Sequence, residues 1–499
     1  MRVPIVVMLV VGLLVSGNSQ PILANFPVET EDLSNGVVID GYAKYGDYVG
    51  VPQADESSQT IVQDIQIRFL NENNQSVDDQ GQPVKGRTQK DFILGLLKLK
   101  PGEIFRDEAL QADLRRLRKL ESFNDVRAYR EESPFGVSII YDIKERRFPS
   151  WNFGGGSNDD IGLYGRVGYR DANISGLNDQ LATTVQVSGK DVQFNSQFTS
   201  PYRPGEPERL GYSVSAFRDR QISPTFDDEV KLANGDRTRE GRFGGSVAVL
   251  RSFDDWDAAL GLNFTRISLR DRDYNVVQVD EFGNPLSVSG TGIDDLFTLS
   301  LAVTRDLRDG LRPAVGDRRS NPTQGSILTL STAQAIPLGL GNIFSNRIQG
   351  NYIQYLPVTW IGRQNFPDNS EMVAVNVQLG TILGDFPPAD AFNLGGLNSV
   401  RGYGSGKLAS GRSYGLASVE YRFPIIESIG GVVFTDFASD FGSAETVIGQ
   451  PGVVRNKPGS GFGYGVGVRL NSPFGLFRGD LGVSDQGEVR LEITTGQKF

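Results

Sequence analysis

The sequence predicts a mainly β protein: a sixteen-stranded antiparallel transmembrane β-barrel preceded by one small α/β domain. Short segments of alternating polarity, separated by Gly, Asp, Asn and Pro, fill residues 148–499. The chain contains 60 Gly, and aromatic residues make up 10% of it, which is typical of membrane barrels. Beyond its N-terminus it has no apolar run of about 18 residues, so a membrane-embedded form must be a barrel.

The first 24 residues have the pattern of a signal peptide. Arg2 supplies a positive charge, residues 3–15 are apolar, and Ala24 is a small residue suited to cleavage. A membrane anchor is the alternative, but about 13 apolar residues are fewer than the roughly 20 that a span needs. Residues 25–59 are polar and acidic without strong periodicity, and we predict a flexible acidic linker there.

Residues 60–147 are predicted to form the α/β domain, in the order strand, helix, helix, strand, strand. The expected apolar face of the first strand consists of Ile61, Ile65, Ile67 and Phe69. Thr88 is predicted to cap a short helix that ends at Leu97. The next helix covers about residues 106–120, where apolar residues recur every three to four positions. Alternating strands are expected at 125–129 and 137–143.

Residues 148–499 are predicted to form the barrel. Apolar residues from Phe462 to Leu470 alternate with a series of glycines, and the alternation of residues 488–499 continues to Phe499. A period of two with one apolar face fits a strand between lipid and a polar lumen. At about ten residues per strand plus loops, the region has room for roughly sixteen strands. A soluble β-sandwich is the alternative, but such domains rarely reach this length.

The composition argues against several kinds of site. The chain has no Cys and no His, so it lacks thiolate metal ligands and imidazole acid–base chemistry. A Gly-x-Ser-x-Gly pattern at residues 411–415 lacks the His base that a nucleophile elbow needs. The net charge of -10 argues against a nucleic-acid partner. We therefore expect a protein that is not an enzyme and that uses no cofactor and no catalytic metal.

The candidate functional segment is a loop at residues 392–403, in a Gly-rich stretch at 384–415 that is too irregular for a strand. Glu420 and Asp436 follow it, each with the parity of the inner wall in its predicted strand. Arg401 of the loop can meet both carboxylates inside the barrel, because a guanidinium binds carboxylates in bidentate fashion. A lone Arg-Gly-Tyr would be read as a solvated loop, but the order of loop, Glu strand and Asp strand favours internal pairing.

These features resemble the BamA superfamily of outer-membrane assembly factors, which also includes TamA proteins and two-partner secretion transporters. The family's Val-Arg-Gly-Tyr tetrad is matched by Val400, Arg401, Gly402 and Tyr403. In the family the loop arginine packs against acids of the inner wall, and Glu420 and Asp436 occupy those places. Residues 60–147 resemble a POTRA domain. Phe499 matches the aromatic residue that ends many bacterial outer-membrane proteins and is read by the assembly machinery.

The resemblance implies a protein that binds unfolded outer-membrane or secreted proteins and inserts or exports them. It implies an outer-membrane location with the N-terminal domain in the periplasm, in contact with the bilayer, lipopolysaccharide and accessory subunits. The barrel seam is expected between a first strand near Trp151 and Phe153 and a last strand that runs to Phe499. Gly-rich residues 151–157 pack weakly, so a client strand could add at this edge by β-augmentation.

Two other functions remain open. A passive outer-membrane channel explains the barrel and the signal peptide, but it does not explain the α/β unit or the tetrad. A two-partner secretion pore would handle one dedicated exoprotein. The sequence contains one POTRA-like unit, whereas assembly factors usually carry several and two-partner transporters carry two with a plug helix. The choice among these subfamilies is therefore left open by the sequence.

Overall fold

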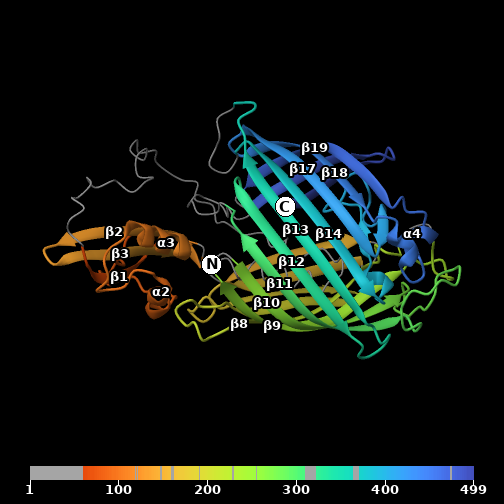
Figure 1. The fold of residues 1–499 in the computed structure, drawn as a ribbon, viewed down its shortest axis with the longest axis horizontal. Helices are drawn as coiled ribbons and strands as arrows, with labels where there is room; N and C mark the ends of the chain where they lie inside the picture. Colours follow the sequence, from red (N-terminus) through yellow and green to blue (C-terminus); the bar gives the residue numbers. More distant parts are fainter. Residues whose placement is uncertain are drawn as a thin grey trace.

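The computed structural model describes residues 60–499 except 119, 121, 147–148, 159–161, 190, 227–229, 254–255, 309–321, 363–369 and 473–474. The predicted signal peptide and acidic linker lie outside the described residues. A small α/β domain precedes a 16-stranded antiparallel sheet that is curled into a barrel (Figure 1), which confirms the predicted fold class. Within the described part of the chain, no helix is long and apolar enough to cross a membrane.

The α/β domain has the predicted order of elements. They are β1 (Val62–Leu70), α2 (Lys90–Leu96), α3 (Asp107–Arg118), β2 (Phe123–Ser133) and β3 (Gly136–Glu145). Strand β3 is central, parallel to β1 and antiparallel to β2. The apolar stripes of both helices and the buried face of the sheet form one core, which includes Ile93, Leu96, Leu117 and Ile139. This burial holds the short helices in place, since isolated helices of this length are marginal in water.

Two details of this domain differ from the sequence prediction. Ile61 is 46% exposed, whereas Val62 is fully buried, because the pairing register shifts at the start of β1 and reverses the alternation there. Thr88 is not the N-cap of α2: that position belongs to Gln89, which makes no side-chain capping bond. The Thr88 hydroxyl instead donates to the Glu145 carboxylate, so it ties α2 to the end of β3.

The domain contacts the barrel through the turn between β5 and β6. The Gln89 amide donates to the carbonyl of Gly176 over 2.9 Å. The side-chain amide of Asn173 donates to the Thr88 hydroxyl over 2.8 Å. Arg87 pairs with Asp171 at 2.6 Å between Nη2 and Oδ2. This turn therefore marks the end of the barrel nearer the domain.

The barrel strands follow one another in sequence order, each antiparallel to its neighbours. They are β4 (Ser150–Asn158), β5 (Gly162–Asp171), β6 (Gln180–Ser188), β7 (Val192–Ser200), β8 (Gly211–Ile222), β9 (Arg239–Phe253), β10 (Trp256–Arg270), β11 (Ile293–Asp306), β12 (Gly325–Ile336), β13 (Ser345–Pro357), β14 (Met372–Gly384), β17 (Ser413–Ile426), β18 (Ile429–Ser439), β19 (Ser460–Ser472), β20 (Gly475–Ser484) and β21 (Val489–Thr495). Successive strands run in opposite directions, so their connections alternate between the two ends of the barrel. Counted from the β5–β6 turn, the connection from β14 to β17 lies at the end away from the domain. It contains a 3-10 turn, η3 (Pro388–Asp390), and a short hairpin of β15 (Phe392–Leu394) and β16 (Ala409–Gly411), where the sequence predicted no strand.

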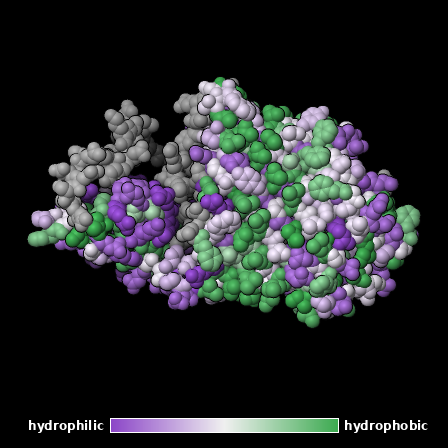
Figure 2. All heavy atoms as spheres, in the orientation of Figure 1, coloured by the Kyte–Doolittle hydropathy of each residue, from purple (hydrophilic) through white to green (hydrophobic). Residues whose placement is uncertain are grey.

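The outer surface of the barrel is apolar where the sequence alternation places it. Val466, Val468 and Leu491 are 54%, 51% and 68% exposed. Figure 2 shows hydrophobic side chains spread over the visible face of the barrel. Exposed aliphatic and aromatic residues on alternate strand positions are what a lipid-facing wall requires.

The two terminal strands of the sheet, β4 and β21, form the seam. The hydrogen-bonded order of the described strands begins at β4 and ends at β21, and no ladder joins these two. Trp151 and Phe153 on β4 point outward and are 50% and 75% exposed. Trp151 packs edge-on against Tyr169 of β5, with ring centroids 4.9 Å apart.

The last strand ends earlier than the sequence alternation predicts. Strand β21 stops at Thr495, and Gly496 adopts a φ of 80°, which a glycine tolerates without strain. Phe499 is therefore not part of the seam strand. It packs against a cluster on the inner wall that includes Tyr355 and Met372, on β13 and β14. In Figure 1 the C-terminal label lies within the outline of the barrel.

Candidate functional site: a loop anchored inside the barrel

The connection between β14 and β17, residues 385–412, folds back into the barrel and is packed there by apolar side chains. Val400 is fully buried and Tyr403 is 3% exposed. Both belong to a cluster with Leu394, Leu408 and wall residues such as Leu416. The loop is therefore a built part of the barrel interior, because flexible solvated loops do not bury residues of this size.

The first part of this loop is anchored by arginines of two other wall strands, β9 and β13. Arg242 of β9 donates from Nη1 to Oδ1 of Asp390 over 2.9 Å and from Nη2 to the carbonyl of Ala389 over 3.1 Å. Arg347 of β13 donates to the carbonyl of Asp390 over 3.0 Å. The guanidinium of Arg347 also lies over the ring of Phe392, 4.2 Å from its centroid. The loop thus begins against one side of the barrel.

The tip of the loop places Arg401 against three further wall strands, β17, β18 and β20. Nε and Nη2 of Arg401 donate to the two oxygens of Asp436 on β18 over 2.7 and 3.0 Å, a bidentate pair. Nη1 donates to Glu420 of β17 over 2.6 Å and to Asp480 of β20 over 3.1 Å. The Arg401 side chain is completely buried. The structure thus brings together the loop arginine and the two wall carboxylates that the sequence singled out, and it adds a third.

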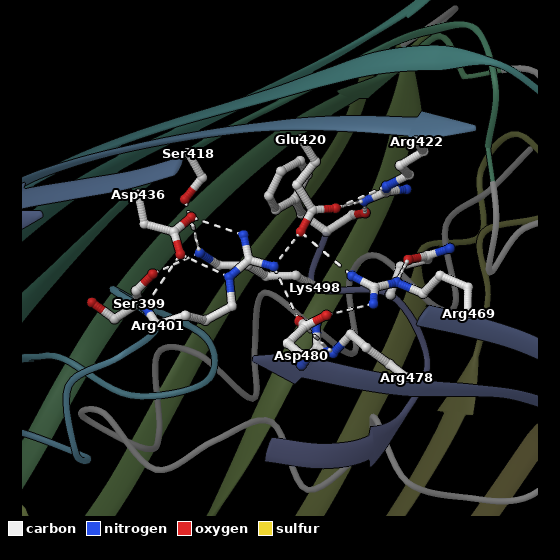
Figure 3. Close-up of polar contacts among 12 residues, drawn as sticks. Ser399, Arg401, Ser418, Glu420, Arg422, Asp436, Arg469, Arg478, Asp480 and Lys498 are labelled. Atoms are coloured by element: carbon white, nitrogen blue, oxygen red, sulfur yellow. Dashed lines mark hydrogen bonds and ion pairs between the residues drawn. The ribbon is translucent and has the colours of Figure 1, made fainter. Parts of the chain in front are cut away.

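These groups belong to a larger set of buried charges, which we call the ion cluster. Its members are Arg401, Glu420, Arg422, Asp436, Arg469, Arg478, Asp480 and Lys498 (Figure 3). Glu420 accepts from Arg422 as well as from Arg401, and Asp480 accepts from Arg469 over 2.5 Å. Charges removed from water are tolerated only when paired in this way. Such networks contribute little net stability, but they favour one arrangement of the groups that they join.

The aromatic ring of Phe434 packs against the guanidinium of Arg401. The Arg401 guanidinium carbon lies 3.4 Å from the centroid of this ring, which projects inward from β18 beside Asp436. Stacking on an aromatic face suits a guanidinium better than an ammonium, because the planar group keeps its edge donors free for carboxylates. A lysine at position 401 would therefore lose both the stacking and the bidentate pair.

Wall glycines make room for the loop backbone. On β19, glycines at alternate positions face inward, and a Cβ added to Gly463 would lie 1.9 Å from the carbonyl oxygen of Arg401. A Cβ on Gly482 of β20 would lie 2.7 Å from the amide nitrogen of Gly402. Gly402 itself has a φ of 96°, and a Cβ there would lie 2.6 Å from the backbone nitrogen of Ser484. The loop and the wall therefore touch backbone to backbone, which only glycine permits.

The fourth residue of the tetrad is also held by a carboxylate. The Tyr403 hydroxyl donates to Asp485, in the short connection between β20 and β21. A Cβ on Gly461 would lie 2.6 Å from this hydroxyl oxygen, so another β19 glycine provides its space. Tyr403 thereby adds a second contact between the loop and the last hairpin of the barrel, beside that of Arg401 with Asp480.

Sequence reasoning missed several residues of this site. Asp480 and the glycines had readable signals: Asp480 has inward parity between outward Leu481 and Phe477 on β20, and the β19 glycines occupy only the inner face. Lys498 was missed because the alternation of residues 488–499 suggested a continuous strand. No local pattern marks Asp485 as the partner of Tyr403.

Comparison with known proteins places this geometry in a family. The model described as "Omp85 superfamily domain" matches residues 173–499, and the POTRA model, described as "Surface antigen variable number repeat", matches residues 81–146. The crystal structure of BamA from Haemophilus ducreyi lacking POTRA domains 1-3 covers 87% of this chain and 84% of its own, with a TM-score of 0.55 and 18% identity. At that identity the likeness concerns the fold.

Curated relatives come from chloroplasts. Outer envelope protein 80, chloroplastic, from Arabidopsis thaliana is 29% identical over 452 residues, covering 88% of this chain and 57% of that protein. Protein TOC75, chloroplastic, from Pisum sativum is 27% identical over 466 residues, covering 85% and 55%. The chain thus spans little more than half the length of these relatives. The match over the barrel, together with the barrel and the POTRA fold, establishes that the chain belongs to the Omp85 superfamily, as its resemblance to BamA implied.

Proposed function

We propose that this protein is an assembly factor of the outer membrane, which binds unfolded β-barrel clients and inserts them into the bilayer. The observation that supports this proposal most directly is the buried pairing of Arg401 with Glu420, Asp436 and Asp480. This pairing fixes a long loop inside the barrel. A loop held by so many wall groups serves a barrel whose strands must keep a defined arrangement while a client is handled. Client folding supplies the free energy, and no nucleotide or covalent step is needed.

The seam supports this proposal. The described residues of β4 and β21 share no ladder, so both strands offer backbone donors and acceptors. Strand β4 contains three consecutive glycines, 154–156, which give little side-chain packing. A client strand can add to such an edge by β-augmentation. The POTRA domain, placed in the periplasm, offers further strand edges in β1 and β2, and it is the expected meeting point for accessory subunits.

The experiment is insertion of an unfolded client by the purified full chain. The protein is reconstituted in liposomes, a urea-unfolded eight-stranded barrel is added, and the folded client is quantified by its resistance to protease and its shifted mobility without heating. Arg401→Ala, Glu420→Ala and Asp436→Ala are compared with the unaltered protein. Each is expected to slow insertion at least tenfold, equivalent to about 1.4 kcal/mol in the barrier.

Arg266→Ala is the matched control. Arg266 of β10 also forms a bidentate pair with a wall carboxylate, Asp295, at 2.7 and 2.9 Å, but neither residue touches the loop tetrad. This variant is expected to insert clients at the normal rate. If all three cluster variants also insert clients normally, the proposed mechanism is wrong.

Export is the second candidate, because two-partner transporters share the predicted tetrad and barrel. Depletion in the native cell separates the possibilities when all outer-membrane barrels are then quantified. Broad loss of barrels supports assembly, whereas loss of one exoprotein supports a dedicated secretion pore. Unchanged protein levels combined with steady ion conductance would indicate a passive channel, although the buried loop argues against an open lumen.

A further inference from the structure

Two segments that enter the barrel from opposite ends meet at Asp436. The loop at 385–412 comes from the end away from the POTRA domain, and residues 496–499 follow β21 at the domain's end. Lys498 Nζ lies 2.7 Å from Oδ1 of Asp436, and Nη2 of Arg401 lies 3.0 Å from the same oxygen. One carboxylate therefore joins the loop tip to the segment after the seam strand. Figure 3 shows both cations pointing toward this acid.

Lys498 also binds the loop directly. Its ammonium donates to the carbonyl of Ser399, one residue before the tetrad, over 2.6 Å. A third bond, to the hydroxyl of Ser418 on β17, measures 2.9 Å. An ammonium has three donors, and here all of them are used on the loop and on the two wall strands that hold Arg401. The Lys498 side chain is 1% exposed, so it cannot exchange these partners for water in place.

The rest of the 496–499 segment also contacts the wall. Gln497 accepts from Nε of Arg469 over 2.9 Å. The backbone oxygen of Phe499 accepts from Nη2 of Arg422 over 3.0 Å, and the Phe499 ring packs on the inner wall. The Gly496 amide donates to the carbonyl of Leu476 over 2.7 Å. The segment thus spans from the seam strand to the ion cluster, and Lys498 joins it to the loop.

We propose that Lys498 is a positioning residue for the loop tetrad and that the 496–499 segment couples docking of the loop to the position of the seam strand β21. Movement of β21 away from β20 withdraws Lys498 from Ser399 and Asp436, so the loop loses its direct bond to Lys498, and the wall carboxylate that holds Arg401 loses a partner. Release of the loop in turn takes the Ser399 carbonyl away from the Lys498 ammonium. Coupling between two sites is reciprocal, and it holds whether clients are inserted or exported.

The test uses a buried thiol as a reporter of loop docking. The chain has no Cys, so Val400→Cys in the full-length protein carries a single thiol at a fully buried loop position. Adding Lys498→Met is expected to raise the rate of labelling by a water-soluble maleimide about tenfold, the change produced by losing about 1.4 kcal/mol of docking free energy. Gln497→Ala is the matched control, because it removes a wall contact of the same segment and should leave the rate unchanged.

A second reporter separates coupling from general loosening of the barrel. Ala248→Cys, in a separate wall cluster with Leu250 and Ala259, is also buried and should stay protected in Lys498→Met. The reciprocal reporter is Gln497→Cys. Its labelling should rise when Arg401→Lys weakens the loop anchor. This measurement tests the coupling if Lys498→Met does not fold. Unchanged labelling of Val400→Cys in Lys498→Met and of Gln497→Cys in Arg401→Lys would overturn the proposal. An equal rise in Val400→Cys labelling with Gln497→Ala would also overturn it. Neither outcome depends on the client assay.

Discussion

The carbonyl oxygen of Arg401 lies 1.9 Å from the position that a Cβ on Gly463 would occupy. The loop backbone therefore rests directly on the backbone of β19, with no space for even a methyl group. The ion cluster can form only because this approach is possible. The inward-facing glycines of β19 therefore belong to the site together with the charged residues, because they allow the loop to approach the wall closely.

Gly463→Ala is expected to lift the loop tip from the wall and to lengthen the contacts between Arg401 and Asp436. Client insertion should fall at least tenfold, as for removal of the arginine, because the methyl group and the carbonyl cannot share the space. Gly479→Ala on β20 is the control, since a Cβ there meets nothing within 4 Å. Equal insertion rates for these two alanine variants would show that loop seating does not limit activity.

Asp480→Asn should destabilise the barrel. This carboxylate is approached by Arg401, Arg469 and Arg478, and its neutralisation takes one opposite charge from each of these buried guanidinium groups. Removing one partner of a buried ion pair costs about 3 kcal/mol or more. Urea unfolding in lipid vesicles, followed by tryptophan fluorescence, measures the change in the free energy of unfolding.

Asp191→Asn provides the comparison for the Asp480 variant. Asp191 is buried, but it pairs with Arg218, whose side chain is 50% exposed, so water can solvate the guanidinium when the carboxylate is neutralised. The free energy of unfolding should therefore change less than in the Asp480 variant. A loss at Asp480 no larger than that at Asp191 would mean that the ion cluster reorganises around the missing charge.

Asp113 is a structural carboxylate of the POTRA domain whose removal should unfold that domain selectively. It accepts the backbone amides of Lys98 and Leu99 over 2.5 and 3.1 Å and the hydroxyl of Tyr141 over 3.2 Å. Asp113→Ala leaves these donors unsatisfied, at a cost of about 2 kcal/mol. Limited proteolysis of the full chain should then cleave residues 60–146 while the barrel resists, whereas exposed Asp91→Ala should show the normal pattern.

The same carboxylate predicts a pH dependence. Burial raises the pKa of Asp113 above its usual range, and the hydrogen bonds from Lys98, Leu99 and Tyr141 offset only part of that effect. A carboxyl group whose pKa is raised by folding is most favourable to the folded state below its unfolded pKa of about 4, and that contribution is lost as the pH rises through the folded pKa. As the pH rises from about 4 through the folded pKa of Asp113, proteolytic resistance of the domain should therefore decline more steeply in the unaltered chain than in Asp113→Asn. Parallel pH profiles for the two proteins would contradict the assignment.

The contact between the POTRA domain and the barrel should depend on Asn173. Its side-chain amide bonds Thr88 of the domain, and its side-chain oxygen accepts the Asn178 amide over 2.7 Å, so it also shapes the β5–β6 turn. Asn173→Ala is expected to broaden the distances between spin labels placed on the domain and on the barrel. Gln89→Ala, which removes an exposed side-chain contact to the same turn, should leave the distribution narrow. A narrow distribution in both variants would show that Asn173 does not fix the domain.

The sequence predicted the parts of this protein that depend on period and parity. Alternation along β17 and β18 placed Glu420 and Asp436 on the inner wall, because neighbouring side chains of a strand must point to opposite faces. The length of the barrel region left room for roughly sixteen strands, and the order of elements in the POTRA domain followed from its apolar stripes. These are properties that a few adjacent residues determine.

The features that the sequence did not predict depend on contacts between distant segments. The alternation of residues 488–499 continues through Lys498, yet Gly496 turns the chain into the lumen, where the ion cluster binds the lysine. Thr88 has the chemistry of an N-cap, but Glu145, 57 residues away, takes its hydroxyl. In both cases the local pattern suggested one role for the side chain, and a contact with a distant segment gives it another.

The glycine face of β19 also bears on how this barrel itself is completed. A strand with glycine at every other position loses more backbone entropy on ordering than its neighbours and has few inward side chains to recover it. Two of its glycines, Gly461 and Gly463, lie directly against Tyr403 and Arg401 of the loop. The loop thus supplies packing that this part of β19 lacks, and we expect β19 to be less well ordered in a barrel from which the loop is withdrawn.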